Sequence, residues 1–561
     1  MKSNCIQLQE ANCKNCYKCV RYCPMKSIKV VDGHAEIIPA ECILCGRCYV
    51  NCPQNAKRLR DDTAPAKQLI GEGAEVYASV APSYIANYKG INMEIMRDAL
   101  KKLGFKDAGE TAVGATVVKR EYERLIRERS SSVVISSCCH SVNTLIQKHY
   151  PDVLPYLAHV LSPMQAHGQI LREEHPGCHV VFIGPCISKK DEVDRYGEYI
   201  DCALTFEELN SWMDEAGVEF DYSVKNAEDG GRTRLFPTRG GIIDSMDLDD
   251  SFSYFSVDGI ENCMNALEDI RDGNIENCFV EMSACNSSCI GGPVMMHDKV
   301  FHVSSCLTIG KTAGKKDFPI EQPESPRLKK NFDAEYIRRN MPGSAAVKEI
   351  LHQMGKNTPE QELNCGSCGY PTCREKAVAV LNGKADMNMC LPFLKEKAES
   401  FSDTIINNTP NGIIVLNKEL EIQQINKAAQ RIMNIKNASD VMGEPVVRIL
   451  NPTDYMLAMT DVQKSPEPNR KYLSEYKKYV EETIIYDPEY SIIMSIMKDV
   501  TDEEVMREKK AEQSLSAAEL TDRVVEKQMR VVQEIASLLG ETTAETKIAL
   551  TKLKETLSQD E

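Results

Sequence analysis

The sequence predicts a multidomain protein of mixed α/β and α+β class, built from five consecutive segments. Three observations predict this: two cysteine-dense stretches, a long central stretch in which strand and helix patterns alternate, and a C-terminal third without cysteine. The length of 561 residues alone suggests three or four domains, and changes in composition place the boundaries. The expected segments are residues 1–60, 70–355, 356–398, 400–502 and 503–561.

The overall charge and the cysteine content restrict the partners and the compartment. With 67 basic and 83 acidic residues the net charge is -16, and such a surface repels nucleic acid and anionic lipid. No apolar run is long enough to cross a membrane, and the first residues lack the apolar stretch of a secretion signal. The 23 cysteines indicate metal binding rather than a disulfide framework. We therefore expect a cytoplasmic protein without nucleic-acid or membrane partners.

The first segment contains one cysteine pattern twice. Each copy has the spacing C-x2-C-x2-C-x3-C-P, in which three thiolates of one loop hold three irons of a cubane and the fourth reaches the other cluster. Structural zinc needs separate four-ligand knuckles and does not explain the doubled pattern. The segment is therefore predicted to be a ferredoxin-like module with two electron-conducting 4Fe–4S clusters. The two ligand sets are Cys13, Cys16, Cys19 and Cys52, and Cys42, Cys45, Cys48 and Cys23.

The central segment shows an α/β pattern whose expected strand ends carry cysteines. Ligand sites in open α/β sheets lie at the carboxyl ends of strands, and Cys138, Cys186 and Cys285 each follow a short apolar run. With Cys139 and Cys289 these residues supply four dispersed thiolates for a further cluster and one extra cysteine. The expected strands are 76–80, 133–135, 180–183 and 279–282, and the expected helices are 93–103 and 119–129.

Three sequences in this segment resemble the signature motifs of FeFe-hydrogenases, TSCCPxW, MPCxxKKxE and FxExMACxGxC. They occur in the same order, and the likeness extends over about residues 1–355. The resemblance implies an H-cluster α/β domain, with a two-iron subsite that carries CO, cyanide and a bridging dithiolate. The ligands it implies for the cubane are Cys139, Cys186, Cys285 and Cys289, the last being shared with the two-iron subsite.

The same resemblance assigns roles to side chains around the subsite. Lys189 matches the lysine that hydrogen-bonds a cyanide, although a surface salt bridge is the ordinary alternative for a lysine. Cys138 matches the thiol that passes protons to and from the bridging amine. The residues expected to line the pocket are Ala81, Pro82, Ser83, Phe236 and Pro237, together with Gly184 and Ser283, which each stand where the family has Met.

The departures from the family motifs concern proton transfer. Of two relay carboxylates only Glu121 is retained, because Val118 stands in place of the other. Ala158 and Leu125 replace a relay serine and an outer arginine, and an apolar side chain cannot pass a proton. His140 stands where the family has Pro, and we expect it to be a loop residue rather than a substitute relay. Intact ligands with a degraded proton route predict slow turnover and resemble the sensory branch of the family.

The third segment is a second cysteine-rich module. Its spacing C-x2-C-x4-C-x16-C resembles a small 4Fe–4S module found beside other redox domains. Four cysteines also suit a closed structural zinc site, so both metals remain open. The candidate ligands are Cys365, Cys368, Cys373 and Cys390.

The fourth segment, residues 400–502, resembles a PAS domain. The sequence Asp499-Val500-Thr501 is similar to the motif at the exit of many PAS domains, and Thr501 with Glu504 fits a capping box. Residues 400–500 contain neither His nor Cys, so the usual haem ligand and flavin-adduct thiol are missing, which favours a relay or dimerisation module. The expected strands are 412–416, 421–426 and 491–497, with a helix at 427–435.

The tail is charged and helical. Val525, Met529, Val532 and Leu539 recur at helical intervals, and we expect Gly540 to end this helix before a second one. A helix folded on its own domain would explain the stripe, but the tail has little else to bury against. We therefore favour dimerisation, and expect a homodimer.

Together these features predict a hydrogen-sensing FeFe-hydrogenase. Its substrates would be H2 and protons, its electron partner a protein such as ferredoxin, and its output a signalling protein of the kinase or phosphatase class. Four cubanes and the two-iron subsite would hold about 18 iron atoms. The alternatives are a metabolic ferredoxin-linked hydrogenase and a non-enzymatic iron–sulfur assembly protein without the two-iron subsite.

Overall fold

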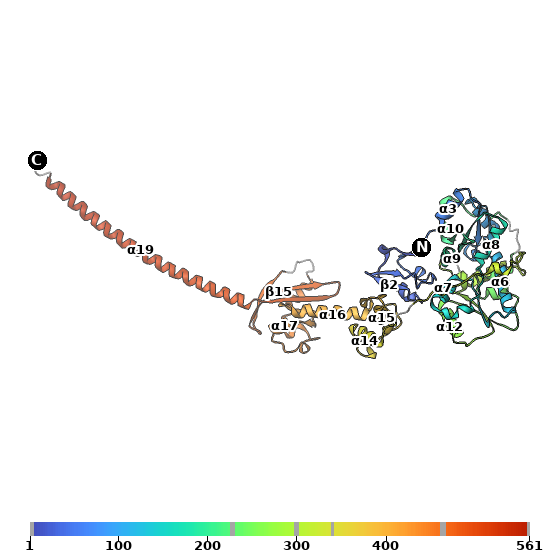
Figure 1. Cartoon of the computed structure of the whole chain (residues 1–561). Coiled ribbons are helices and arrows are strands. Elements are labelled where there is room, and N and C mark those ends of the chain that lie inside the picture. The colour runs from blue at the N-terminus through green and yellow to red at the C-terminus, as the bar shows by residue number, and fades with distance from the viewer. Residues whose placement is uncertain (1–4, 225–229, 297–301, 338–340, 461–466, 558–561) are drawn as a thin grey trace. The chain divides into compact units, whose positions relative to one another are not determined.

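The computed structural model describes residues 5–224, 230–296, 302–337, 341–460 and 467–557 (Figure 1). The chain divides into two compact units, Met1–Leu394 and Lys395–Glu561. Across the described ranges, no helix is both long enough and apolar enough to cross a lipid bilayer.

The N-terminal module is built from two small antiparallel strand pairs and two short helices. Strand β1 pairs with β4, which brings the two ends of the module together, and β2 pairs with β3. The helices each carry the third cysteine of one motif, Cys19 or Cys48. The bounds are β1 Ile6–Leu8, α1 Lys18–Tyr22, β2 Ile28–Val31, β3 His34–Ile37, α2 Arg47–Val50 and β4 Lys57–Leu59.

The central domain contains two parallel sheets, and all four expected strands are confirmed. The first sheet has the order β6-β5-β8-β9 and the second β10-β11-β7. Strands β5 and β8 are buried almost throughout, because a parallel sheet covered by helices on both faces needs near-continuous apolar runs. The strands are β5 Val76–Val80, β6 Asp107–Glu110, β7 Val133–Ile135, β8 His179–Gly184, β9 Cys202–Thr205, β10 Ser253–Asp258 and β11 Cys278–Ser283.

Helices surround these sheets and include both that the sequence predicts. Helix α6 contributes a buried face to an apolar cluster that also contains residues of β7, α8 and β11. The helices are α3 Thr63–Gly71, α4 Tyr84–Asn87, α5 Met93–Lys102, α6 Ala112–Arg127, α7 His140–His149, α8 Pro163–Glu174, α9 Ser188–Tyr196, α10 Phe206–Ala216, α11 Gly241–Ser245, α12 Ile260–Arg271 and α13 His302–Thr312.

The second cysteine-rich module packs directly on the N-terminal module. A Cβ atom at Gly369 would lie 2.9 Å from Val20, and Lys26 Nζ donates to the Gly369 carbonyl oxygen at 2.9 Å. Val30 N donates to the Lys384 carbonyl oxygen at 3.0 Å. The two modules therefore share one apolar core. The helices here are α14 Ser344–Gln353, α15 Cys373–Leu381 and α16 Leu391–Asn408.

The second unit contains a five-stranded antiparallel sheet of order β13-β12-β16-β15-β14, and the three expected strands are confirmed with shifts of one or two residues. Helix α17 ends at Ile432 rather than at residue 435, because Asn434 adopts a left-handed conformation with φ of 52°. The bounds are β12 Gly412–Leu416, β13 Ile422–Ile425, α17 Lys427–Ile432, α18 Thr453–Thr460, β14 Asn469–Leu473, β15 Lys478–Asp487 and β16 Ile492–Asp499.

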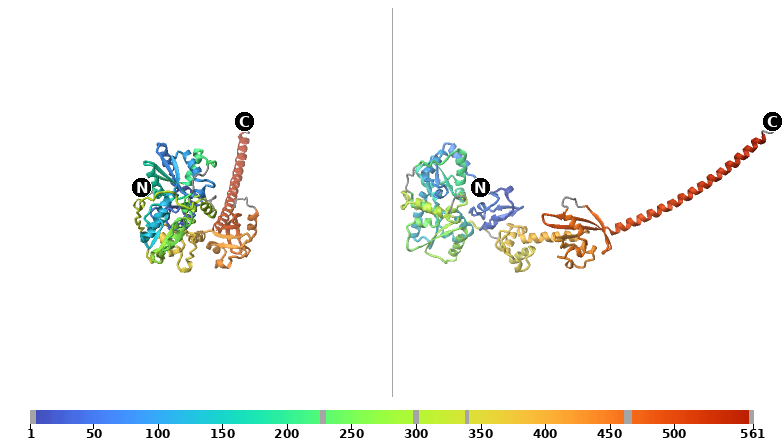
Figure 2. Two further views of the ribbon diagram at one scale, coloured as in Figure 1. Left: turned by 90° about the vertical axis from the view of Figure 1, so that its right-hand side faces the viewer. Right: turned by 180° about the vertical axis from the view of Figure 1, so that it is seen from behind.

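The tail differs from expectation at two points. Helix α19 (Thr501–Leu557) continues through Gly540 without a break (Figure 2), because one exposed glycine costs only about 1 kcal/mol in a helix interior. The expected capping box between Thr501 and Glu504 is also wrong, because the main-chain N–H of Thr501 donates to Asp499 Oδ1 at 3.0 Å and not to the Glu504 side chain. The Glu504 carboxylate instead accepts from Arg470 Nη1 at 2.9 Å. Residues 558–561 of the expected tail lie outside the described residues.

Candidate active site and electron relay

Strand ends from both parallel sheets of the central domain meet at one cavity of about 120 Å³. Ala81, Pro82 and Ser83 follow β5, Cys186 follows β8, and Cys138 follows β7. The carboxyl ends of parallel strands lie at one edge of a sheet, which is why segments so far apart in the chain converge here. Of the pocket residues that the sequence predicts, those lining the cavity are Ala81, Pro82, Ser83, Phe236, Pro237 and Ser283.

The four thiols expected to hold a cubane lie close enough to interact. Cys139, Cys186 and Cys289 line the cavity. Burial raises the pKa of Cys285, and thiolates at Cys186, Cys139 and Cys289 would raise it further. Four thiolates so close together repel one another, so the group suits a cationic partner such as iron. Cys289 is the one exposed thiol of these four, and it lines the cavity.

A cubane places each thiolate on a different iron, so its ligands are spread more widely than those of a single ion. Among the described residues, no three His, Cys, Asp or Glu side chains form a group that could hold a metal ion.

Two polar groups beside these thiols fit the two-iron subsite. Lys189 Nζ donates to the Cys138 carbonyl oxygen at 3.2 Å and to Glu192 Oε2 at 2.5 Å. Burial alone would lower the pKa of Lys189, but the Glu192 carboxylate outweighs it and raises this pKa, so the group is an ammonium donor. Ser83 Oγ is fully buried at the cavity and has no hydrogen-bond partner within the described part of the chain. Both donors suit a ligand that carries cyanide.

Cys138 is a protonated thiol held by a tyrosine that the sequence does not point to. Burial raises the pKa of Cys138 to about 12. Its sulfur lies 3.2 Å from Tyr122 Oη, which also accepts a hydrogen bond of 2.9 Å from Ser137 N. Tyr122 is the neighbour of Glu121 on α6, and no motif or spacing connects it to Cys138.

The structure does not bring Glu121 to the cavity. Its carboxylate accepts hydrogen bonds from Arg124 Nη2 at 2.7 Å and from Ser325 Oγ at 2.9 Å. Val118 and Ala158 belong to the apolar cluster against which Cys138 packs, so the two positions expected to be relay residues are part of a nonpolar core. The relay role of Glu121 stays a prediction.

Gly184 also lies outside the cavity lining. A Cβ atom there would come within 2.6 Å of the Phe182 ring and 3.0 Å of Ala81. Phe182 itself lines the cavity, so it occupies space that a side chain at position 184 would need. Gly184 thus affects the shape of the cavity indirectly, because its lack of a side chain leaves space for the Phe182 ring.

His140 is a buried helix residue, so the expectation of a loop residue is wrong. It is the first residue of α7, and its Nε2 lies 2.9 Å from Asp191 Oδ2. Burial lowers its pKa, so the imidazole is neutral near pH 7. The buried carboxylate of Asp191 supplies the partner that allows a histidine in this core, which no sequence pattern indicates.

Glu281 is a further cavity residue to which the sequence assigns no role. Burial raises the pKa of its carboxyl group to about 7. The carboxylate accepts hydrogen bonds of 3.0, 3.0 and 3.1 Å from the main-chain nitrogens of Gly240, Ile242 and Ile243. These hydrogen bonds hold the segment that follows Phe236 in sequence against strand β11 of the second sheet.

In the N-terminal module, Cys23 of the first motif interacts electrostatically with cysteines of the second, and the crossed ligand assignment as a whole stays a prediction. Burial is the main cause that raises the pKa values of Cys42 and Cys45 to about 11 and 12, and a Cys23 thiolate contributes to both shifts. Cys23 thus lies with the second motif. The two crossing cysteines also have matching environments: Ser27 N donates to Cys23 Sγ at 3.4 Å and Ala56 N to Cys52 Sγ at 3.3 Å.

This module touches the candidate site through Gly46. A Cβ atom at Gly46 would come within 2.5 Å of Pro293 and 2.9 Å of Ile187, which lie just beyond the cavity cysteines in sequence. Cys45 interacts electrostatically with Cys285. The second cluster would therefore adjoin the cubane of the site and could deliver electrons to it.

The module with Cys365, Cys368, Cys373 and Cys390 also contacts the N-terminal module, around Val20 and Lys26. Burial raises the pKa of Cys368, and thiolates at Cys390 and Cys365 raise it further, so these three lie together. Lys26 interacts electrostatically with both Cys23 and Cys368, which places this module beside the second cluster as well.

Comparison with protein families matches four parts of the chain. Residues 74–248 and 245–293 match the C-terminal domain of the iron-only hydrogenase large subunit, and residues 5–63 match a 4Fe-4S dicluster domain. An Fe-S cluster family matches residues 361–392 and the PAS fold residues 400–474. The chain therefore carries a ferredoxin-like 4Fe–4S domain, a hydrogenase-like H-cluster domain, an Fe–S module and a PAS domain.

Relatives of two kinds resemble this chain. The periplasmic Fe hydrogenase large subunit of Nitratidesulfovibrio vulgaris is 25% identical over 371 residues, 52% of this chain and 87% of that protein. The cytosolic Fe-S cluster assembly factor NAR1 of Encephalitozoon cuniculi is 25% identical over 199 residues, 31% of this chain and 55% of that protein. The match thus spans about half the length of NAR1. A solved FeFe-hydrogenase from Chlamydomonas reinhardtii is 16% identical with a TM-score of 0.41, and covers 50% of this chain and 100% of that one.

Proposed function

We propose that the protein is a hydrogen-sensing FeFe-hydrogenase that slowly and reversibly oxidises H2 and reduces protons at an H-cluster. The observation that carries the proposal is the cavity beside Cys289, where the thiol of Cys138, the ammonium of Lys189 and the unpaired hydroxyl of Ser83 meet. A cluster that only transfers electrons needs no cavity lined by proton and hydrogen-bond donors.

When bound, the two-iron subsite would supply the H2-splitting chemistry. Lys189, fixed by Glu192, would orient the subsite by hydrogen bonding and balance its negative charge in a water-poor cavity. The thiol of Cys138 holds a proton at neutral pH, because burial keeps its pKa near 12. Apolar Val118 and Ala158 near it would slow the passage of that proton to solvent, which accounts for slow turnover.

The same proposal includes an output. Electrons would pass from the site to the clusters of the N-terminal module and then to a redox partner such as ferredoxin. The state of the clusters would bias the PAS domain and α19, and so a downstream signalling protein of the kinase or phosphatase class in the cytoplasm. The protein would act as a homodimer, because the apolar stripe of α19 from Val525 to Leu539 is solvent-exposed and lies on one unbroken helix.

Infrared spectroscopy of the matured full chain under H2 tests the proposal. We expect CO and cyanide bands on iron, about 18 iron atoms per chain, and a specific activity far below that of metabolic hydrogenases. High specific activity would instead support the metabolic alternative, in which the PAS domain is a scaffold.

A second candidate is a non-enzymatic iron–sulfur assembly protein without the two-iron subsite. The likeness to NAR1, at the same 25% identity as the hydrogenase from Nitratidesulfovibrio vulgaris, favours it. Absence of CO and cyanide bands after maturation, with the cubanes still present, would support this candidate and contradict the first.

A further inference from the structure

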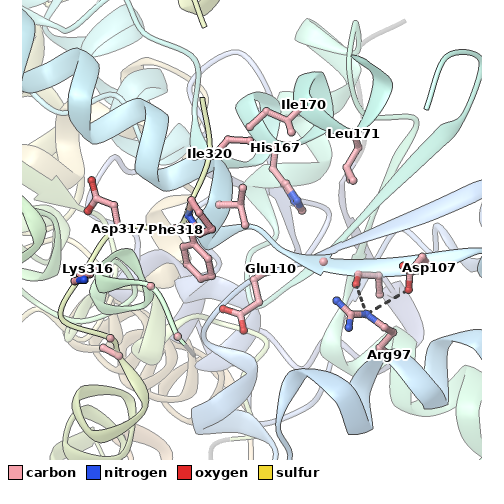
Figure 3. A pocket seen from close by; sticks show the side chains of 18 of the residues that line it. Arg97, Asp107, Glu110, His167, Ile170, Leu171, Lys316, Asp317, Phe318 and Ile320 are labelled. Carbon is pink, nitrogen blue, oxygen red and sulfur yellow. Dashed lines mark hydrogen bonds and ion pairs between the residues drawn. The ribbon is translucent and has the colours of Figure 1, made fainter. Parts of the chain in front are cut away.

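A second, larger cavity lies beside the candidate site. It has a volume of about 1130 Å³ and is lined by charged side chains that include Asp107 and the exposed Lys316 (Figure 3). His167 lines this outer cavity, as its label in Figure 3 shows, and Thr111 lines the inner cavity that contains Cys138. His167 and Thr111 therefore lie on opposite sides of the wall between the two cavities.

A short chain of hydrogen bonds joins these two residues. His167 Nδ1 lies 2.8 Å from Ser79 Oγ, and Ser79 Oγ lies 2.8 Å from Thr111 Oγ1. His167, Ser79 and Thr111 are 3%, 0% and 4% exposed, so water competes little for these bonds. Each hydroxyl can donate or accept, and a neutral imidazole can carry its proton on either nitrogen. Every link can therefore pass a proton in either direction.

We propose that His167, Ser79 and Thr111 form a proton path between the outer cavity and the candidate active site. The inference rests on the proposed function, since a path is needed only if protons are made or consumed at the site. It would serve in place of the route near Cys138, where Val118 and Ala158 are apolar.

Inward transfer balances without any change of electrons. The Nε2 atom of His167 takes a proton from water in the outer cavity, and Nδ1 releases its own proton to Ser79 Oγ. Ser79 passes its hydroxyl proton to Thr111, and Thr111 passes its hydroxyl proton to a base in the inner cavity. Rotation of the hydroxyls and of the ring restores the starting arrangement. Outward transfer is the reverse.

The imidazole is suited to relay a proton rather than to store one. Burial lowers the pKa of His167 to about 4, so the ring is neutral near pH 7 and a protonated ring is short-lived. A relay with such a high-energy step is slow, which agrees with the low turnover proposed above.

Two substitutions test the path at different links. Ser79→Ala removes the middle hydroxyl. Gly109→Ala retains all three side chains of the path. Its Cβ atom would lie 3.3 Å from both Cε1 and Nε2 of His167, so it crowds the ring edge that takes up the proton. Gly71→Ala is the matched control, because a Cβ atom there would meet nothing within 4 Å.

The readout is the rate at which the CO and cyanide bands of the matured full chain respond to a rapid change of pH, measured beside H2 turnover. Ser79→Ala should slow the response and turnover about tenfold or more, and Gly109→Ala should slow them severalfold. Band positions and iron content should not change in either variant. Wild-type rates in both variants, with bands present, would overturn the path alone. Missing bands in the wild-type protein would overturn the proposed function and the path with it.

Discussion

Lys189 Nζ donates a hydrogen bond of 3.2 Å to the main-chain carbonyl oxygen of Cys138. The two residues follow strands of different sheets, so this bond joins the two halves of the cavity wall. Glu192 accepts from the same ammonium through one oxygen and from Lys330 Nζ at 2.7 Å through the other. The largely buried ammonium is thereby held in place, and its charge is compensated by the fully buried Glu192 carboxylate.

Replacing Lys189 by Met should prevent retention of the two-iron subsite while the cubanes remain. The substitution removes the ammonium donor, whereas Glu192 keeps its partner Lys330. Iron analysis should fall from about 18 to about 16 atoms per chain, and the CO and cyanide bands should disappear. Lys316→Met changes an exposed lysine of the outer cavity and should alter neither quantity. Normal bands in the Lys189 variant would contradict the role assigned to this residue.

Gly46→Ala should weaken the contact between the N-terminal module and the candidate site. Gly46 has φ of 75° and its Cβ atom would overlap Pro293, whereas Gly73 has φ of 79° with nothing within 4 Å. Both alanines should lose about 1–2 kcal/mol because of the left-handed backbone. The Gly46 variant should lose more, and should slow electron transfer between the module and the site.

Chemical denaturation and the rate of electron transfer after photoreduction measure these two effects. Comparing the Gly46 variant with the Gly73 variant separates the effect of backbone strain from the effect of the contact with Pro293. Equal losses of stability, with equal rates in the two variants, would show that the contact has no part in electron transfer.

The central domain should lose stability as the pH falls below the pKa of free histidine. Burial holds the pKa of His167 at about 4, against 6.5 for an exposed histidine. Between these values the unfolded chain binds a proton that the folded chain does not, so the stabilisation is complete above pH 6.5 and is lost as the pH falls toward 4. The loss is about 3 kcal/mol, at about 1.4 kcal/mol for each pKa unit.

Urea denaturation at a series of pH values measures this loss, with His167→Gln as the comparison. The variant cannot gain a proton at this position, so its stability should fall less over the same pH range. Parallel curves for the two proteins would show that His167 is not the group responsible.

The apolar stripe of α19 should hold two copies of the chain together. Val525 and Val532 lie on this stripe and are 53% and 56% exposed. Replacing both by Asp places charges where a coiled-coil seam needs apolar side chains, so the dimer should become a monomer in analytical ultracentrifugation. Lys527 and Glu534 are also exposed but each lies two positions further along, on another face of the helix, and replacing both by Asp should leave the dimer intact. A monomeric wild-type chain, or equal effects of the two pairs, would contradict dimerisation through this face.

The metal-binding parts of the molecule could be predicted from local spacing. The spacing of the doubled cysteine motif predicts that the fourth cysteine of each copy reaches the other cluster, and Cys23 interacts electrostatically with Cys42 and Cys45. The four buried strands of the central domain were predictable because parallel strands covered on both faces are continuous apolar runs. Residues at the carboxyl ends of these parallel strands were therefore expected to lie close together.

Contacts between segments that lie far apart in the sequence could not be predicted from local sequence patterns. Nothing in the spacing of Tyr122 connects it to Cys138, and the burial of His140 is explained only by Asp191, which lies 2.9 Å away. The break expected at Gly540 failed for a different reason, since the cost of one exposed glycine is small beside the cooperativity of a long helix.

By itself the sequence determined which residues can bind iron and which strands carry them, because ligand spacing and strand patterning are properties of neighbouring residues. Only the tertiary structure decided which side chains surround the thiols, that Glu121 is paired with Arg124 away from the cavity, and that Ser79 links His167 to Thr111. Those relationships depend on how two sheets and their helices pack, and packing brings together residues whose separation along the chain carries no signal.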